Sequence, residues 1–252
     1  MSTSRFHILQ TPIHCVNLHS AKEKTLSFAN KNEKKYIVFR DVHGVIRCQD
    51  DPEFLRVHRE ATLVCPDGMP LVWLGKRRGF KDMGRVYGPD LMRELMNATR
   101  DGSASHYLYG GNVGVADQLK QALEQQFPGV NICGTFCPPF GPLDPETESE
   151  LHQHVAKRKP DFFWVGLSTP KQEFFMNEYL PKLDTTIMLG VGAAFDYLSG
   201  NVKEPPIWIQ RSGFQWLYRI CSEPKRLFGR YLKAVPRFLW LTFKEERSLK
   251  HR

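Results

Sequence analysis

The chain has 252 residues, of which 41% are hydrophobic and 25% charged, a composition typical of a folded globular protein. No apolar run approaches the roughly 18 to 20 residues of a membrane-spanning helix, and Met1–Cys15 has no apolar core of signal-peptide length. We therefore expect a cytosolic protein. The six cysteines form no Cys-x-x-Cys pair, and Cys133 and Cys137 have no second ligand pair at zinc spacing, so we expect no metal and no disulfide framework.

Positive charge is concentrated at the C-terminal end. Residues 201–252 carry twelve Lys and Arg against four acidic residues, which accounts for the whole net charge of +8. The 200 residues before them carry equal numbers of each sign. Such an asymmetry indicates an anionic partner for the tail: a phospholipid surface, a nucleic acid or a phosphorylated substrate.

Short β-rich runs alternate with helical segments along the middle of the chain. The run over residues 161–167 is almost continuously apolar, which is typical of a buried parallel strand. The alternation predicts an α/β fold, a Rossmann-like and mainly parallel sheet with flanking helices. We expect strands at Tyr36–Phe39, Thr62–Cys65, His106–Tyr109, Asn131–Phe136, Asp161–Leu167 and Thr186–Val191, and helices at Pro52–Glu60, Pro89–Arg100, Val115–Phe127, Glu146–Lys157 and Pro170–Leu180.

Two acidic residues follow the first two predicted strands, and ligands of open α/β sheets bind at the carboxyl ends of strands. Asp41 comes just after the first strand, with His43 close behind it. His43 can carry a proton or bind phosphate, although a lone histidine is more often structural. Asp67 follows the second strand in Pro-Asp-Gly. Asp before Gly is also a common turn, and the local sequence favours that interpretation.

The glycine-rich segment 110–114 leaves a strand and opens a helix. Gly110 and Gly111 would let the backbone approach a phosphate next to the free N–H groups of the helix start. The spacing matches neither the dinucleotide fingerprint nor the Walker A loop. Nucleotide-phosphate binding and a simple chain reversal are equally compatible with these residues.

The segment 166–173 leaves the most apolar strand and enters a helix. Ser168 or Thr169 is placed to cap that helix, with a proline in its first turn. Lys171 and Gln172 would then lie in the first turn, facing either a ligand or solvent.

Small residues end the last predicted strand, in the segment 190–197, and permit close approach by a ligand or by packed helices. Asp196 in this segment could bind a sugar hydroxyl, cap a helix or pair with an arginine of the tail.

Taken together, these segments resemble the WecG/TagA/CpsF glycosyltransferase family over roughly Lys35 to Phe243. No single piece is decisive, but seven segments in register are hard to produce by accident. They are Asp51–Phe54, Leu63–Pro70, Tyr87–Met92, the Gly110-Gly111 loop, Gly166–Glu173, Gly192–Asp196, and the closing stretch Gln210–Arg219 with Glu223–Leu227.

The resemblance implies a metal-independent, inverting transferase that needs no cofactor and uses a UDP-sugar and an undecaprenyl-diphosphate-linked acceptor. It implies that Asp67 is the general base, which reverses the local preference for a turn. Gln172 would contact the donor substrate. Without a metal, cations and N–H groups must neutralise the leaving UDP, and the arginines of the tail that match the family best are Arg211, Arg219 and Arg226.

The chain departs from the family pattern after the first strand. Many members carry Thr-x-Asn there, whereas this chain has Phe39-Arg40-Asp41 followed by Val42-His43-Gly44-Val45. The Val42-His43-Gly44-Val45 motif is similar to the one in a subgroup of exopolysaccharide enzymes, some members of which transfer glucuronic acid. N-acetylmannosamine and a uronic acid therefore both stay open as the donor sugar, and Arg40 or Arg85 could meet a uronic carboxylate.

The basic tail has the pattern of an interfacial membrane helix. Apolar and aromatic residues recur at helical spacing between cations, and Pro236 is expected to kink or restart the helix. A helix docked on the core is the alternative. We expect a glycosyltransferase core over residues 1–200 and a membrane-associating appendage over residues 201–252, which would place the protein on the cytoplasmic face of the bacterial inner membrane. Monomers and homo-oligomers both stay open.

Two rival functions are less well supported. A nucleic-acid-binding protein would explain the basic tail, but the body is neutral and has no binding motif, so we expect no nucleic acid partner. A Rossmann-type oxidoreductase would need a dinucleotide fingerprint and a ribose-binding acid, which the sequence lacks.

Overall fold

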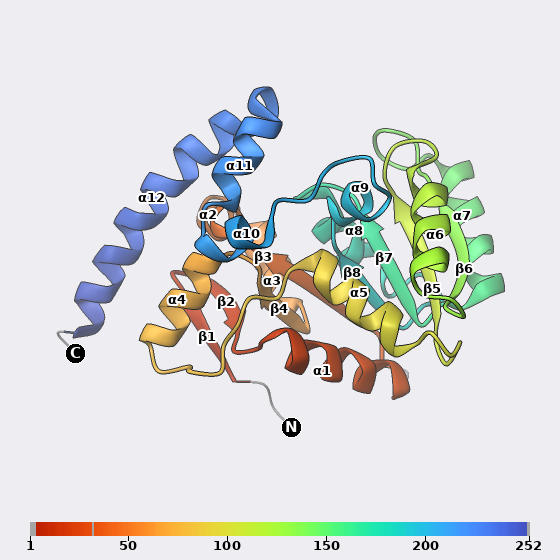
Figure 1. The fold of residues 1–252 in the computed structure, drawn as a ribbon, viewed down its shortest axis with the longest axis horizontal. Coiled ribbons are helices and arrows are strands. Elements are labelled where there is room, and N and C mark those ends of the chain that lie inside the picture. The colour runs from red at the N-terminus through yellow and green to blue at the C-terminus, as the bar shows by residue number, and fades with distance from the viewer. Residues whose placement is uncertain (1–3, 32, 251–252) are drawn as a thin grey trace.

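Six parallel strands form the central sheet of the computed structural model (Figure 1), which describes residues 4–31 and 33–250, without the side chains at positions 226, 230 and 250. The strand order is β4-β3-β8-β7-β5-β6, so the chain crosses over between non-neighbouring strands. The predicted α/β fold and all six predicted strands are confirmed. The strands are β3 (Lys35–Arg40), β4 (Leu63–Pro66), β5 (Ser105–Gly110), β6 (Asn131–Phe136), β7 (Phe162–Gly166) and β8 (Ile187–Gly190).

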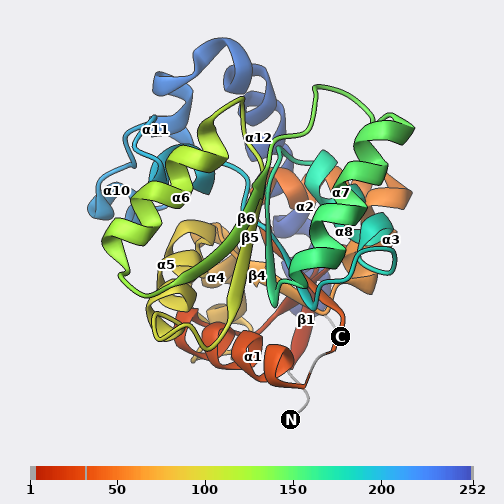
Figure 2. The same cartoon turned by 90° about the vertical axis from the view of Figure 1, so that its right-hand side faces the viewer.

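Side chains that alternate along each strand supply two separate cores. In β3, Ile37 and Phe39 pack with helices α1, α5 and α6, whereas Tyr36 and Val38 pack with α3, α7 and α8. Figure 2 shows these two layers of helices on either side of the sheet. The helices are α1 (Leu18–Asn30), α3 (Pro52–Glu60), α5 (Gly88–Ala98), α6 (Val115–Gln126), α7 (Pro145–Arg158) and α8 (Lys171–Tyr179).

Five early elements were not predicted. The strands β1 (Arg5–Ile8) and β2 (Thr11–His14) pair antiparallel outside the main sheet. Helix α1 begins with a capping box in which Asn17 and Ser20 satisfy each other's backbone N–H groups. The other two are α2 (Val42–Asp50) and α4 (Met69–Arg77). One residue separates α2 from the predicted strand β3, and two residues separate α4 from the predicted strand β4.

The C-terminal third folds into short helices and one long one. These are α9 (Ala194–Leu198), α10 (Ile207–Ser212), α11 (Gln215–Ser222) and α12 (Pro224–Lys250). We expected Pro236 to kink or restart the helix. Helix α12 runs through Pro236, so it does not restart there, and the kink stays a prediction. Proline removes one backbone hydrogen bond, but Ala234 and Phe238 on either side of it are both buried in the same core. Packing therefore holds the two halves in one helix.

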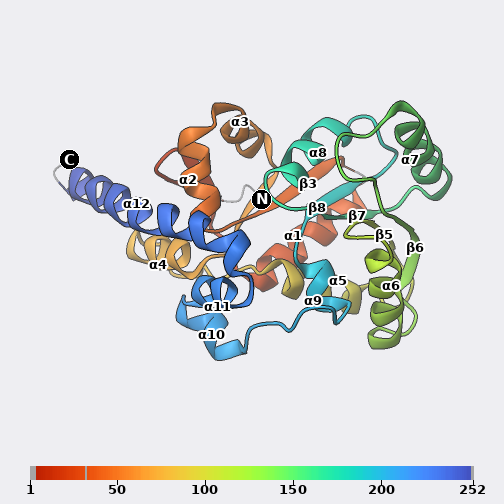
Figure 3. The ribbon, with the colours of Figure 1, turned by 90° about the horizontal axis from the view of Figure 1, so that it is seen from above.

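Helix α12 is docked along the body of the protein. It lies against α2, at the opposite end of the molecule from α7 (Figures 1 and 3). Its far end is fixed by Arg78, the C-cap of α4, whose guanidinium contacts the carboxylates of Glu245 at 2.5 Å and Glu246 at 2.7 Å. None of the described helices is long and apolar enough to cross a membrane. The division of the chain at residue 200 stays a prediction.

Candidate active site

A cavity of about 1170 Å³ runs along the carboxyl ends of the strands. Segments that follow every strand of the main sheet contribute to it, which is the position expected for a ligand site in an open α/β sheet. Eight of the residues selected from the sequence line this cavity: Asp41, His43, Asp67, Gly111, Lys171, Gln172, Asp196 and Arg219.

Two of the other three selected residues do not line the cavity, and the third cannot be placed. Gly110 ends β5, and a Cβ on it would approach the carbonyl carbon of Gly166 to 2.8 Å. Arg211 is exposed on α10. The side chain of Arg226 lies outside the part of the chain that the structure describes.

Asp67 lies just beyond β4 and faces the cavity with 26% of its side chain exposed. Its Oδ1 is 3.2 Å from a terminal nitrogen of Arg85, and the Arg85 Nε–H donates to the Asp67 carbonyl at 2.6 Å. Burial raises the pKa of Asp67 and the nearby Asp41 carboxylate adds to this, whereas Arg85 and Arg219 oppose it. The net pKa of Asp67 is above its ordinary value.

The pKa of Asp41 is shifted in the opposite direction to that of Asp67. It is the N-cap of α2, and its Oδ1 accepts from the Gly44 N–H at 2.8 Å. Burial would raise the pKa of Asp41, but His43, the Gly44 N–H and two arginines outweigh it and lower that pKa. Two neighbouring carboxylates whose pKa values are pushed apart are typical of an acid–base site. Asp67 is the better proton acceptor of the two.

Arg85 joins Asp67 to the C-terminal helices. One terminal nitrogen lies 3.1 Å from Oε1 of Gln210 in α10, and the other donates to Oε1 of Gln215 in α11. The guanidinium also stacks over the Tyr87 ring, 4.1 Å from its centroid. Arg85 is eighteen residues from Asp67, and no local signal in the sequence indicates this pairing.

Arg219 of α11 brings a partly buried cation to the same cavity. Burial would lower its pKa, but Tyr231, Tyr197, Tyr87 and Asp41 raise it, so the guanidinium stays charged. Its Nε atom is buried and has no hydrogen-bond partner among the described residues. The sequence identified Arg219 but not the tyrosines around it, which come from three distant segments.

Beneath the cavity, Arg40 and Glu173 form an ion pair with 2% and 0% of their side chains exposed. Glu173 also accepts from Thr169 Oγ1 and Gln172 Nε2, each at 3.0 Å. The prediction that Ser168 or Thr169 caps α8 is wrong, because Pro170 is the N-cap and no side chain caps it. Thr169 instead supports Glu173.

A family model for the WecG/TagA/CpsF glycosyl transferases matches residues 6–252. The chain belongs to this family. It is 26% identical, over 88% of its length and 84% of the relative's, to an N-acetylglucosaminyldiphosphoundecaprenol N-acetyl-beta-D-mannosaminyltransferase of Bacillus spizizenii. A protein of the same name from Staphylococcus aureus (strain MW2) is 27% identical over 88% and 85% of the two chains. The membership favours the transferase hypothesis over both rivals.

The two arginines proposed for a uronic carboxylate are already engaged in this glycosyl transferase. Arg40 is paired with Glu173 below the cavity, and Arg85 is held by Asp67 and the two glutamines. Neither lines the cavity. Of the Lys and Arg side chains that the structure describes, Lys171 and Arg219 face the cavity. Lys171 Nζ lies 4.1 Å from the centre of the Phe140 ring.

The glycine loop of the transferase has a structural explanation of its own. Gly110 and Gly111 both have positive φ, at 115° and 78°, which favours glycine. The Gly111 N–H already donates to the Gly166 carbonyl at 3.1 Å, so it is not free for a phosphate. Phosphate binding by this loop stays a prediction, with Val113 94% exposed at the rim.

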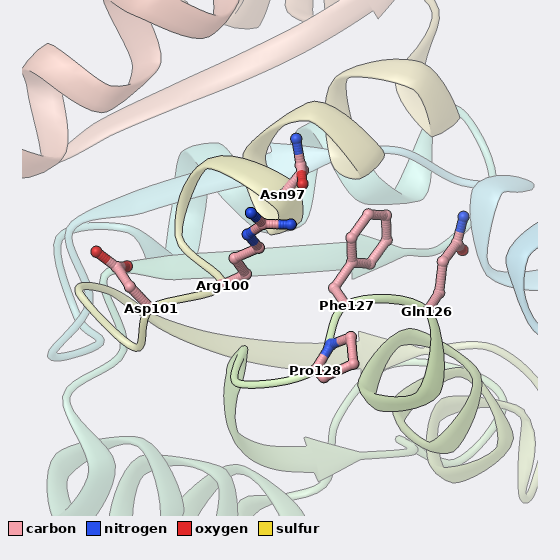
Figure 4. A pocket seen from close by; sticks show the side chains of 6 residues that line it. All are labelled: Asn97, Arg100, Asp101, Gln126, Phe127 and Pro128. Atoms are coloured by element: carbon pink, nitrogen blue, oxygen red, sulfur yellow. The ribbon is translucent and has the colours of Figure 1, made fainter.

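A second hollow of about 500 Å³ lies away from the strand ends (Figure 4). The C-terminal ends of α5 and α6 form it, and it contains none of the residues selected from the sequence. Among the described residues, no group of three or more His, Cys, Asp and Glu side chains is arranged to hold a metal ion.

Proposed function

We propose that this transferase moves N-acetylmannosamine or glucuronic acid from a UDP-sugar to an undecaprenyl-diphosphate-linked saccharide, with inversion and without a metal, in the synthesis of a surface polysaccharide such as an exopolysaccharide. The observation that carries the proposal is that a carboxylate of raised pKa, Asp67, and a partly buried cation, Arg219, line one cavity. The names of the relatives support the lipid-linked acceptor.

The proposed reaction is a single displacement. The oxygen of an acceptor hydroxyl attacks the anomeric carbon from the side opposite the diphosphate, and its proton passes to the Asp67 carboxylate. As the new C–O bond forms, the bond between the anomeric carbon and the diphosphate oxygen breaks, and the electron pair leaves with UDP. Arg219 stabilises the charge that develops on the diphosphate.

His43 is the second residue that we assign to catalysis. It lies in the first turn of α2, faces the cavity and lowers the pKa of Asp41. In this role it keeps Asp41 ionised, and an ionised Asp41 can accept hydrogen bonds from substrate hydroxyls. Asp196 would accept further hydrogen bonds from those hydroxyls. Lys171 and Gln172 would contact the donor from the opposite side of the cavity.

The C-terminal helices support binding to the cytoplasmic face of a bacterial membrane. Helix α12 buries one stripe of residues in the protein and exposes a second apolar stripe beside it. Lys233 and Arg237 are among the cations next to that second stripe. Exposed apolar residues flanked by cations suit an interfacial helix, and this stripe contains Phe228, Leu232, Leu239, Trp240 and Phe243.

The proposal is tested by UDP release with a short-chain lipid-diphosphate sugar as acceptor. UDP-N-acetylmannosamine and UDP-glucuronic acid are supplied in turn, with and without EDTA. We expect acceptor-dependent UDP release from one donor, unchanged by EDTA and lost in Asp67→Asn. Asp184→Asn, at a carboxylate with 54% exposure and paired with Lys159, is the matched control. No release from either donor by folded protein would contradict the proposal.

A further inference from the structure

The side-chain amide of Gln172 has its two ends in different surroundings. Gln172 lines the cavity with only 4% of its surface exposed. Its Nε2 donates to the Gly190 carbonyl at 2.9 Å and to Oε1 of Glu173 at 3.0 Å. Its Oε1 is buried and has no hydrogen-bond partner among the described residues.

These contacts determine which way the amide points. A backbone carbonyl and a carboxylate can only accept hydrogen bonds, so the donating NH₂ must face them. The reverse orientation would set the Gln172 oxygen against two acceptors and leave both N–H groups unpaired. The oxygen of Gln172 is therefore the atom left for a ligand.

Glu173 holds this arrangement from below. Its carboxylate is fully buried and accepts from Arg40, Thr169 and Gln172. Arg40 supplies the counter-charge that a buried carboxylate needs.

A glycine that also lines the cavity leaves room beside this oxygen. A Cβ at Gly192 would lie 3.2 Å from Gln172 Oε1, so any side chain at position 192 would crowd that atom. An unpaired buried acceptor costs stability, and a ligand that donates to it would recover that cost.

We infer that Glu173 is a positioning residue that fixes the amide of Gln172, and that Gln172 Oε1 accepts a hydrogen bond from an O–H or N–H group of the sugar nucleotide. The inference rests on the proposed function for the identity of the ligand. Two parts of a UDP-sugar carry such groups: the sugar, through its hydroxyls or acetamido N–H, and the uridine, through its ribose hydroxyls or ring N–H. A ligand that lacks the donor would leave the buried oxygen unpaired and be discriminated against.

Two substitutions at one position test both halves of the inference. Gln172→Met removes the acceptor, whereas Gln172→Glu keeps the oxygen but replaces the NH₂ by a second oxygen, which faces the Gly190 carbonyl and Glu173. That glutamate can take the place of the amide only when it is protonated and donates. Full-length wild type, both variants and the control Gln153→Glu, at an exposed position on α7, are titrated by calorimetry with UDP, UDP-N-acetylmannosamine and UDP-glucuronic acid at pH 8 and pH 5.5.

We expect Gln172→Met to bind roughly ten- to a hundredfold more weakly than wild type at both pH values. Gln172→Glu should be as weak at pH 8 and recover at least part of the loss at pH 5.5, when each is compared with wild type at the same pH. A loss already present with UDP assigns the hydrogen bond to the uridine, and a loss confined to a UDP-sugar assigns it to the sugar. Glu173→Gln should weaken the same ligand, with its fold checked by circular dichroism.

Three other results would contradict the inference or the proposed function. Wild-type affinity in Gln172→Met would overturn the role of the oxygen. A pH-independent ratio of Gln172→Glu to wild type would overturn the positioning by Glu173, even if Glu173→Gln does not fold. Failure of wild type to bind UDP or either UDP-sugar would overturn the proposed function, and the inference with it.

Discussion

The sheet edge and the C-terminal helices contribute opposite charges to the cavity. The strand ends supply the carboxylates Asp41 and Asp67, whereas α11 supplies the partly buried guanidinium of Arg219. Arg85 hydrogen-bonds to both regions, to Asp67 on one side and to Gln210 and Gln215 on the other. The strand-end region adds one cation of its own, Lys171, whereas Arg219 joins the carboxylates only through the docking of the C-terminal helices.

The largest effect should come from removing the cation of the C-terminal helices. Arg219→Met should lower kcat by roughly a hundred- to a thousandfold, because one preorganised group for developing negative charge is lost. Steady-state UDP release measures this effect. Arg211→Met, at an exposed position on α10 that does not line the cavity, is the matched control and should retain nearly full activity. Equal losses in the two variants would mean that general positive charge, and not Arg219 itself, matters.

The docking of α12 can be tested at two adjacent residues. Phe238 is 2% exposed and Leu239 is 60% exposed, so they belong to the inner and outer stripes of one helix. Phe238→Ala should lower the free energy of unfolding by about 3 kcal/mol, through lost burial and a cavity. Leu239→Ala should change it by less than about 0.5 kcal/mol but weaken binding to anionic liposomes. Denaturant unfolding and liposome sedimentation separate the two, and similar stability losses would contradict the two-stripe description.

The strands were predictable because each is a short apolar run between polar or glycine-containing segments. Helix α3 (Pro52–Glu60) and strand β6 (Asn131–Phe136) have the bounds that the sequence predicted. Helix α2 was missed because Gly44 in its first turn lowers helix propensity. Glycine is needed there, since a Cβ at Gly44 would lie 2.7 Å from a terminal nitrogen of Arg40. That reason depends on a tertiary contact, and local patterns do not contain it.

The candidate site also contains residues that local sequence patterns indicate and residues that only tertiary contacts bring there. Asp41, Asp67 and Gln172 could be selected because they follow strands, and strand ends of a parallel sheet meet at one edge. The partners Arg85 and Tyr231 could not be selected in this way. Tyr231 lines the cavity and Arg85 contacts Asp67 only because distant segments dock together. Their own sequence neighbourhoods carry no signal for these contacts.

The link between the two regions predicts a change in pH dependence. Arg85 lowers the pKa of Asp67 and so opposes the effect of burial. A general base must be ionised, so activity should be lost as the pH falls through the pKa of Asp67. Arg85→Met should therefore move the acidic limb of the kcat/KM profile to higher pH, by about one pH unit for each 1.4 kcal/mol of lost interaction. An unchanged limb, in a variant that folds and binds UDP, would show that another group controls it.

Low pH should destabilise the body of the protein, residues 1–200, because histidines in it are buried in their neutral form. His14 accepts the Val64 N–H at its Nδ1, and burial lowers its pKa to about 4. His106 accepts from Trp164, and burial lowers its pKa to about 3. Unfolding returns these pKa values to about 6.5, so below that pH the unfolded chain binds more protons and stability falls. Residues 201–250 contain no histidine, which restricts this effect to the body.

A single substitution separates the contribution of His14 from the rest. His14→Asn keeps an acceptor for the Val64 N–H but cannot titrate in this range. Between pH 6 and pH 4.5, the slope of unfolding free energy against pH should decrease by up to about 1.4 kcal/mol per pH unit relative to wild type. Urea unfolding at several pH values measures the slope, and His152→Asn, at a partly exposed position on α7, is the control. An unaltered slope would mean that His14 keeps an ordinary pKa in the folded protein. Burial would then not hold His14 in its neutral form.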